Sequence, residues 1–426
     1  MTNPPAHPLS FPDYRRFLLA RMCGVLAQSL MVVVIGWQAY ETARGAMGMS
    51  IKEASFQLGM IGLAQFLPLF LLSPITGLAA DKFERRRIGQ IAMGLDGVTA
   101  AMLAWATWHG QMSLPLLYLA SIMHGAVRGF IGPALSSLAP NLVPRDVLPR
   151  AIAFSSTNWQ IARIAGPVVA GFAYAAAPAL PYFLAVMMLG AALIALHVMA
   201  PVPQDRITSK ASPFRLMAEG FDYVWHNKML LGCITLDLFA VLLGGATAML
   251  PAFARDLLHV GASGLGLMRA APAVGAVLAG LILSQHPIKR NVGVNMLLAV
   301  GVYGLATALF GLSTTLWFSL AMLAVLGAAD MVSVFIRATL EQLFTPDDKR
   351  GRVMAIAGVF ISASNELGEA ESGLLAALVG PVIAVVAGGI GAIAITMLWA
   401  RLFPVIRTTK SFDAPASTAI EREAVT

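Results

Sequence analysis

The chain has 426 residues, of which 58% are hydrophobic and only 12% are charged, and its formal net charge is +7. A soluble protein needs more polar surface than this to cover its core, so the composition excludes a soluble globular protein and indicates a membrane protein. Lys and Arg lie scattered between apolar runs, an arrangement that favours a membrane topology over a nucleic-acid partner.

Apolar segments follow one another along the chain, and each is long enough to cross a hydrocarbon layer of about 30 Å as one helix. Twelve such spans are predicted, at residues 16–40, 54–80, 88–109, 115–140, 151–177, 181–201, 229–254, 263–286, 292–312, 315–343, 353–378 and 381–403. Residues 1–12 are polar and proline-rich, and the first apolar run lacks a small-residue cleavage site. We therefore expect the first helix to remain in the protein rather than be removed as a signal peptide.

The distribution of cations predicts the orientation, because Lys and Arg gather on the cytoplasmic side of a membrane protein. With the N-terminus inside, the cytoplasmic segments hold 21 Lys and Arg residues, and the opposite side holds only Arg44, Lys52 and Arg255. We therefore expect a multi-pass protein of the bacterial inner (cytoplasmic) membrane with both termini in the cytoplasm.

A break after the sixth span divides the chain into two halves. We predict an N-terminal six-helix bundle at residues 1–201, a cytoplasmic linker at 202–228, and a C-terminal six-helix bundle with a cytoplasmic tail at 229–426. The end of the linker is amphipathic, which predicts a short helix lying at the membrane interface. Its apolar residues recur at helical spacing, at Phe214, Met217, Phe221, Val224 and Trp225.

The two halves resemble each other in sequence. "LVPRDVLPRA" (142–151) matches "FTPDDKRGRV" (344–353) at an offset of 202, and the same offset pairs Gly166 with Gly368 and Gly171 with Gly373. Such a parallel repeat predicts two bundles related by an axis along the membrane normal. The expected fold is therefore an all-α membrane protein of two pseudo-symmetric six-helix bundles.

A highly charged segment, "GLAADKFERRR" (77–87), joins the second and third spans and fits the loop signature G-x-x-x-D-[RK]-x-G-[RK]-[RK]. On these residues the chain resembles a major facilitator superfamily transporter. The resemblance implies that the motif is a cytoplasmic gate, formed by Gly77, Asp81, Lys82, Arg85 and Arg86. For the arginines alone, simple positive-inside topology remains the alternative. Glu84 replaces the usual glycine, so either the turn forms without glycine or Glu84 joins a salt-bridge cluster.

Further segments narrow the resemblance to the branch that contains the bacterial enterobactin exporter and its macrolide-efflux and multidrug relatives. They are "YRRFLLARM", "LVPRDVLPRAIAFSS", "ARIAGPVVAG" and "SPFRLMAEGFDYVWHNKML". Gly166, Pro167 and Gly171 match in part the helix-five motif associated with antiporters. The helix-four arginine motif is absent, since alignment on Gly125 places Ser121 at the arginine position.

Ionisable residues within the predicted spans are functional candidates, because each costs about 2.5–3.5 kcal/mol near the bilayer centre. The cations are Arg21, Arg128, Arg163, Arg269 and Arg337, and the acids are Asp96, Asp237, Asp330, Glu366, Glu369 and Glu371.

The repeat register aligns Arg128 with Asp330, 202 residues later. Residues related by the pseudo-symmetry lie at equal depth, so we predict that the two form a charge pair across a central cavity. The alternative is that each residue pairs within its own bundle.

Glu366 and Glu369 share one face of a helix, and two nearby carboxylates in a medium of low dielectric disfavour double ionisation. We predict that these two couple transport to protons, followed by Asp237. The alternative is a structural salt bridge with a neighbouring helix. Glu371 falls near the periplasmic end of its span.

The expected function is secondary active transport, with the proton gradient as energy source and export of a siderophore or drug as the direction implied by resemblance. Uptake, or lysophospholipid flipping by the same fold, remains an alternative, and a membrane-embedded enzyme or receptor is a remote one. We expect no cofactor and no metal site, since Cys23 and Cys233 fall in predicted helices and the histidines lack ligand spacing. The expected partners are a small-molecule substrate and the lipid bilayer, and the expected state is a monomer.

Overall fold

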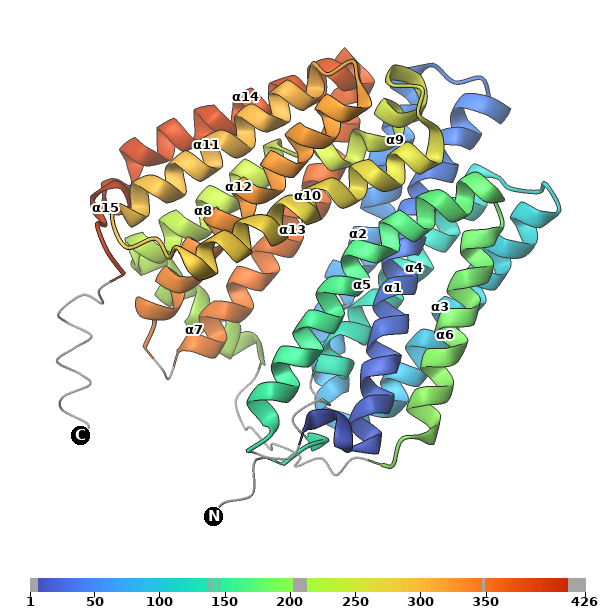
Figure 1. The fold of residues 1–426 in the computed structure, drawn as a ribbon, viewed down its shortest axis with the longest axis horizontal. Helices are drawn as coiled ribbons and strands as arrows, with labels where there is room; N and C mark the ends of the chain where they lie inside the picture. Colours follow the sequence, from blue (N-terminus) through green and yellow to red (C-terminus); the bar gives the residue numbers. More distant parts are fainter. Residues whose placement is uncertain are drawn as a thin grey trace. The chain divides into compact units, whose positions relative to one another are not determined.

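The structure is a computed structural model, and it describes residues 7–136, 138, 141–144, 146–201, 213–346 and 349–412. Helices and the short loops between them make up the described part of the chain, and no strand occurs among the described residues (Figure 1). Its α-helices are α1 (Pro12–Glu41), α2 (Ile51–Lys82), α3 (Arg85–Trp108), α4 (Leu114–Ser136), α5 (Leu148–Ala176), α6 (Leu180–Val198), α7 (Pro213–His226), α8 (Lys228–Leu243), α9 (Leu250–Ala252), α10 (Gly261–Gln285), α11 (Val292–Gly311), α12 (Leu316–Leu343), α13 (Arg350–Val379), α14 (Pro381–Leu402) and α15 (Pro404–Thr408).

Each predicted span except the seventh coincides with one of the long helices. Among the described residues, ten helical segments are both long and apolar enough to cross a membrane. The two others are α5 and α13, with 29 and 30 residues, which is enough length to span a bilayer. Their polar side chains lower their mean hydropathy, since α5 carries Asn158 and Arg163 and α13 carries Glu369 and Glu371.

The predicted seventh span is not one continuous helix, which corrects the expectation for residues 229–254. α8 ends at Leu243, and a 3-10 turn (Ala246–Met249), α9 and a π-helical turn (Phe253–Leu257) follow it. The break falls at Gly244 and Gly245, where neighbouring helices approach closely. A Cβ on Gly245 would come within 2.9 Å of the carbonyl carbon of Gly368. Packing at the break therefore requires glycine, and two glycines in succession weaken the helix.

Contacts divide the chain into two compact units, each built from more than one stretch of sequence. Unit 1 contains residues 1–50, 60–208 and 259–270, and unit 2 contains residues 51–59, 209–258 and 271–426. The beginning of α2 therefore groups with unit 2, and the beginning of α10 groups with unit 1. The division into bundles at residues 1–201 and 229–426 stays a prediction.

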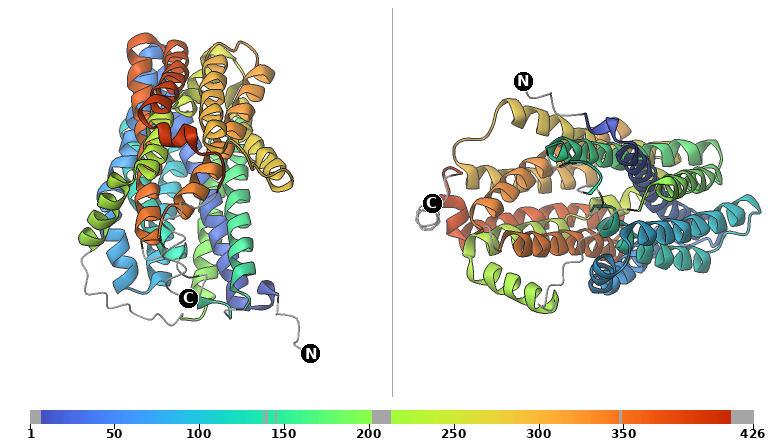
Figure 2. Two further views of the ribbon diagram at one scale, coloured as in Figure 1. Left: turned by 90° about the vertical axis from the view of Figure 1, so that its left-hand side faces the viewer. Right: turned by 90° about the horizontal axis from the view of Figure 1, so that it is seen from below.

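In unit 1, α1 packs against α5 and α6, and α3 packs against α4 and α6 (Figure 2). Small residues allow these helices to approach closely. A Cβ on Gly166 of α5 would come within 3.2 Å of the carbonyl oxygen of Leu26 on α1. On α4, a Cβ on Gly125 would come within 2.9 Å of the Cα atom of Gln65 on α2.

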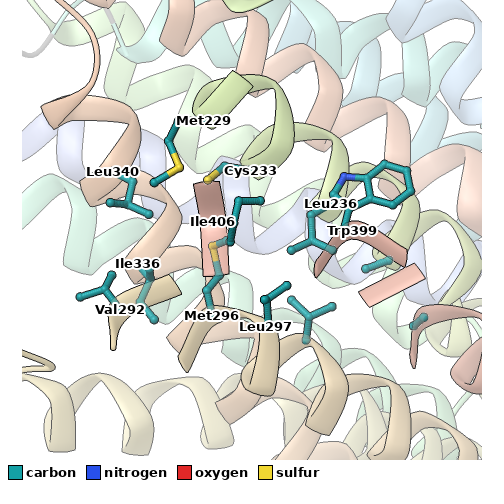
Figure 3. Close-up of a cluster of buried hydrophobic side chains, with 13 residues drawn as sticks. Met229, Cys233, Leu236, Val292, Met296, Leu297, Ile336, Leu340, Trp399 and Ile406 are labelled. Atoms are coloured by element: carbon teal, nitrogen blue, oxygen red, sulfur yellow. The ribbon is translucent and has the colours of Figure 1, made fainter. Parts of the chain in front are cut away.

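In unit 2, α11 packs between α12 and α14, and α8 packs against α13 and α14. An apolar cluster joins α8, α11, α12, α14 and α15 (Figure 3). Its buried members include Met229, Cys233, Leu236, Ile336 and Leu340. The short helix predicted at the end of the linker is present as α7, which packs on α13 through Val224, and its place at the membrane interface stays a prediction. The side chains of Phe214 and Met217 lie outside those the structure describes.

The repeat-related glycines occupy equivalent places in the two units. In unit 1, a Cβ on Gly171 of α5 would lie 2.7 Å from the Cα atom of Gly266 at the beginning of α10. In unit 2, Gly373 of α13 meets the beginning of α2, where a Cβ on Gly59 would lie 2.8 Å from the Cα atom of Gly373. The repeat predicted from sequence therefore corresponds to equivalent helix contacts in the fold.

Large apolar side chains remain exposed on the long helices. Trp108 is 70% exposed, Met187 is 73% exposed and Trp317 is 79% exposed. Exposed apolar side chains on this scale are expected where lipid, rather than water, surrounds the helices.

Candidate functional site

A buried ion pair joins α8 and α12 in unit 2. The guanidinium of Arg337 contacts the carboxylate of Asp237, and the two side chains are 5% and 9% exposed. The residues that precede them, Leu236 and Ile336, belong to the apolar cluster of unit 2. Two opposite charges are thus held together in an apolar surrounding, where an isolated charge would be very costly.

Glu341 is the third member of this site. It lies one turn after Arg337 on α12, with its Oε1 atom 3.9 Å from the Nε atom of Arg337, and its side chain is 3% exposed. Two carboxylates therefore share one guanidinium. If all three groups are ionised the site carries one net negative charge, and binding of one proton neutralises it.

Two members of this site, Asp237 and Arg337, are candidates from the sequence, and the third is not. Asp237 was predicted as a proton-coupling residue and Arg337 as an intramembrane cation, but the two were not expected to pair. Glu341 was not among the candidate acids. Its spacing of four residues from Arg337 on one helix was the signal that could have identified it.

A second polar group surrounds the break that follows α8. The hydroxyl of Tyr303 on α11 donates to the carbonyl oxygen of Gly244 at 3.1 Å, which satisfies a backbone group freed by the break. Asp330 on α12 interacts electrostatically with the same tyrosine. Interrupted helices at membrane depth commonly form transport sites, because their free backbone groups can bind substrates and ions.

The predicted pairing of Arg128 with Asp330 joins residues of different units and stays a prediction. Within unit 1, Arg128 interacts electrostatically with a second cation, Arg163, and the guanidinium of Arg163 lies 4.7 Å from the ring centroid of Trp159. This cation–π contact stabilises Arg163, for which no acidic partner is found among the described residues.

Two further predicted charges are bound within unit 1. Arg21 of α1 donates to the hydroxyl of Ser155 on α5 at 2.6 Å. Asp96 of α3 lies 2.7 Å from the Nδ1 atom of His124 on α4, and both side chains are fully buried. The histidine was not among the residues predicted from the sequence. Arg269 lies half-buried at the beginning of α10.

The glutamates of α13 remain proton-coupling predictions. The helix is continuous from Arg350 to Val379, so residues 366 and 369 share a face as expected. Glu369 is half-buried, and the side chain of Glu366 lies outside those that the structure describes. Glu371 is half-buried and hydrogen-bonds to Ser372.

Glu84 joins a salt-bridge cluster at the start of α3. Its two carboxylate oxygens lie 2.9 Å from Nε of Arg86 and 2.7 Å from Nε of Arg87. Arg86 also donates to the carbonyl oxygen of Met199 after α6. Glu84 has a φ of −63°, so the turn does not require glycine, and both readings of this substitution are compatible with the fold.

The other residues of the predicted gate motif are Gly77, Asp81, Lys82 and Arg85. Arg85 is half-buried, and the side-chain positions of Gly77, Asp81 and Lys82 lie outside those described. The helix-five motif serves packing in unit 1. Gly166 allows contact with α1, Gly171 allows contact with the beginning of α10, and Pro167 lies inside α5 between them. In the described part of the chain, no group of three or more His, Cys, Asp or Glu residues is arranged to hold a metal ion.

Comparison with known proteins identifies a family. The model of the family described as "Transmembrane secretion effector" matches residues 18–425. An enterobactin exporter, EntS, of Escherichia coli O139:H28 (strain E24377A / ETEC) is 25% identical over 391 residues, which cover 91% of each chain. The same protein of Shigella boydii serotype 18 gives the same values.

Solved transporter structures share the fold. A bacterial homologue of the human lysosomal transporter Spinster superposes with a TM-score of 0.70 at 15% identity, over 93% of this chain and 99% of the other. A POT family transporter in complex with 5-aminolevulinic acid also gives 0.70, at 12% identity, over 95% of this chain and 97% of the other.

Proposed function

The chain belongs to the transmembrane secretion effector family of major facilitator superfamily transporters, and on this premise we propose that it is a proton-coupled exporter of a small amphipathic compound. It is a multi-pass membrane transporter and not an enzyme. The proposed cargo is a siderophore or a drug, and the proposed mechanism is alternating access.

The site formed by Asp237, Arg337 and Glu341 is the observation that supports the proposed proton coupling. Its two carboxylates share one cation in a place where both are at least 90% buried. A change in the surroundings of Arg337 alters how many negative charges it can neutralise, and so alters proton binding. Glu369 and the predicted pair of Arg128 and Asp330 are the next candidates.

The direction and the cargo class are supported by the relatives, which are named as exporters of enterobactin. Alternating access is supported by the internal repeat, because repeated bundles commonly open to the two sides in turn. We further propose that both termini lie in the cytoplasm, on the basis of the distribution of Lys and Arg. The monomeric state stays a prediction.

Transport in proteoliposomes tests the proposal. Purified protein is reconstituted, a pH gradient is imposed, and movement of enterobactin and of ethidium is measured in separate experiments. We expect the gradient to drive transport of one of them against its concentration gradient. Glu341→Gln and Asp237→Asn should reduce pH-driven transport at least tenfold, whereas Asp222→Asn, an exposed acid on α7, should not. Equal activity with and without the gradient would disprove proton coupling.

Uptake and lysophospholipid flipping are the alternatives within the same fold. They are distinguished by orientation and by cargo. Accumulation of substrate on the cytoplasmic side would indicate uptake. Movement of a fluorescent lysophospholipid between leaflets, without transport of enterobactin or ethidium, would indicate flipping.

A further inference from the structure

The buried pair of Asp96 and His124 lies in unit 1, apart from the site on α8 and α12. Asp96 belongs to α3 and His124 to α4, and the Oδ1 and Nδ1 atoms are 2.7 Å apart. Both residues are 0% exposed. Burying a carboxylate and an imidazole inside a membrane bundle costs free energy, because the surroundings disfavour the charged form of each group. Such a pair is therefore a candidate functional site.

Each member of the pair has a second polar atom without a hydrogen-bond partner in the part of the protein that the structure describes. These atoms are Oδ2 of Asp96 and Nε2 of His124. The hydroxyl of Ser121, one turn before His124 on α4, is likewise buried without a partner. Buried polar atoms are usually satisfied, so several unsatisfied atoms at one place indicate a site that binds something small and polar.

Gln28 of α1 lies at about the same level along the helices. A Cβ on Gly24 of α1 would lie 2.8 Å from the Cε atom of Met93 on α3, and Gln38 of α1 donates to Thr107 of α3 at 3.1 Å. Each contact joins a residue of α1 to the residue of α3 that lies 69 positions later in the sequence. The two helices therefore run in the same direction, and residues 69 positions apart lie at the same level. In this register Gln28 lies level with Gly97, one residue after Asp96.

The side-chain amide of Gln28 contributes to the group. Gln28 follows Gly24 by four residues, so it lies on the side of α1 that faces α3. Its Nε2 atom is buried and also without a partner in the described part of the chain. Four unsatisfied polar atoms, on three helices, thus occur at one level of unit 1.

We propose that Asp96 and His124, supported by Ser121 and Gln28, form a buried proton-binding site in unit 1. The added proton binds the pair of ionised Asp96 and neutral His124, which then holds it as a short hydrogen bond between carboxylate and imidazolium. No bond other than N–H or O–H forms or breaks, so the step is a simple protonation. The donors of Ser121 and Gln28 have no partner among the described residues, and a shift that brought either of them to Oδ2 would stabilise the ionised carboxylate.

The surroundings of the pair contain few other charges. Within five residues of its level, the packed helices contribute Arg128 on α4, one turn from His124, and Cys23 on α1. α6 has no titratable residue between Tyr182 and His197, and α2 has none between residues 60 and 80. Arg128 is therefore the permanently charged residue that lies nearest to the pair along these helices. The role of the site in transport rests on the proposed proton coupling, but its existence does not.

Nuclear magnetic resonance of histidine tests the site directly. The full-length protein is labelled with ¹⁵N-histidine, purified in nanodiscs and titrated from pH 5 to pH 9. The signal of His124 is identified by its loss in His124→Gln, and His109→Gln, which changes an exposed histidine of the same helical hairpin, is the matched control. We expect the His124 ring to gain one proton as the pH falls. In Asp96→Asn, the charged form should fall at least tenfold at a pH where the wild type holds it.

Two outcomes would overturn the inference. One is a His124 ring that keeps a single charge state from pH 5 to pH 9 in the wild type, a measurement that does not depend on a variant folding. The other is an unchanged titration of His124 in Asp96→Asn. In the proteoliposome assay, His124→Gln should alter the pH profile of transport and His109→Gln should not. A titrating His124 in a protein whose transport ignores the pH gradient would support this site and contradict the proposed coupling.

Discussion

Arg337 of α12 contacts Asp237 of α8 and, more loosely, Glu341 one turn away on its own helix. This asymmetry predicts unequal effects of mutation. Arg337→Met leaves two buried carboxylates without a cation and should destabilise the protein by about 3–5 kcal/mol. Asp237→Asn leaves Arg337 with Glu341 as a partner, so its cost should be clearly smaller.

Thermal unfolding in detergent micelles measures the difference as a ranking of Tm values. Arg290→Met is the matched control, because Arg290 is exposed and its loss should cost less than about 0.5 kcal/mol. Equal Tm values for Arg337→Met and Asp237→Asn would show that Glu341 does not share the guanidinium.

Close packing of α4 on α2 predicts that Gly125 does not tolerate a side chain. A Cβ there would overlap the backbone carbonyl of Gln65, which cannot move without displacing α2. Gly125→Ala should lower the yield of folded protein and its Tm by several degrees. Gly190→Ala on α6 is the control, since its Cβ would meet no atom within 4 Å, and it should stabilise the helix by about 0.5–1 kcal/mol. A folded Gly125→Ala protein with unchanged Tm would contradict the predicted clash.

We predict that the ion pairs of Glu84 make a small, salt-dependent contribution to the stability of the protein. Its carboxylate pairs with Arg86 and Arg87 at the partly exposed start of α3, and such pairs contribute about 0.2–1 kcal/mol each. Glu84→Gly removes these pairs and brings no conformational benefit, because the φ of −63° suits any residue. We expect Glu84→Gly to lower Tm at low salt and to match the wild type more closely at high salt. A higher Tm for this variant would show that the turn needs glycine.

Two exposed aromatic rings on α7 predict contact with the membrane surface. Phe221 and Trp225 are 47% and 60% exposed, and their rings stack with centroids 5.9 Å apart. A different face of α7 is attached to α13, since Val224 is buried there and Glu219 pairs with Arg352 at 2.9 Å.

Quenching by lipids brominated near the headgroup checks this contact. The difference in fluorescence between the wild type and Trp225→Phe is the emission of Trp225, and Phe at this position retains the stacking. We expect the brominated lipids to quench this emission. If it is instead quenched only by iodide in water, α7 does not lie at the membrane interface.

The predicted pairing of Arg128 with Asp330 is checked by a charge swap. Arg128→Ala and Asp330→Ala should each reduce transport at least tenfold. The double variant with Arg128→Asp and Asp330→Arg should recover a substantial part of it, because the opposite charges are restored. A swap that recovers nothing would favour separate pairing within each unit.

Much of the fold was predictable from the sequence, because hydropathy and internal repeats are properties of the sequence alone and do not depend on how the helices pack. A helix that crosses a membrane must be apolar over its length, so the spans could be located without knowing their neighbours. The repeat paired Gly171 with Gly373, and these residues do make equivalent helix contacts. The interruption after Leu243 was missed, because its cause is the approach of Gly368 and Tyr303 from other helices.

The partners of the buried charges were decided by tertiary structure alone. Hydropathy shows that Asp237, Arg337 and Asp96 lie within spans, but it does not show how each helix is rotated about its axis. That rotation, set by side-chain packing between helices, brings Asp237 to Arg337 and Asp96 to His124. The sequence therefore determined that this protein is a membrane transporter with costly charges inside it, and packing determined which of those charges act together.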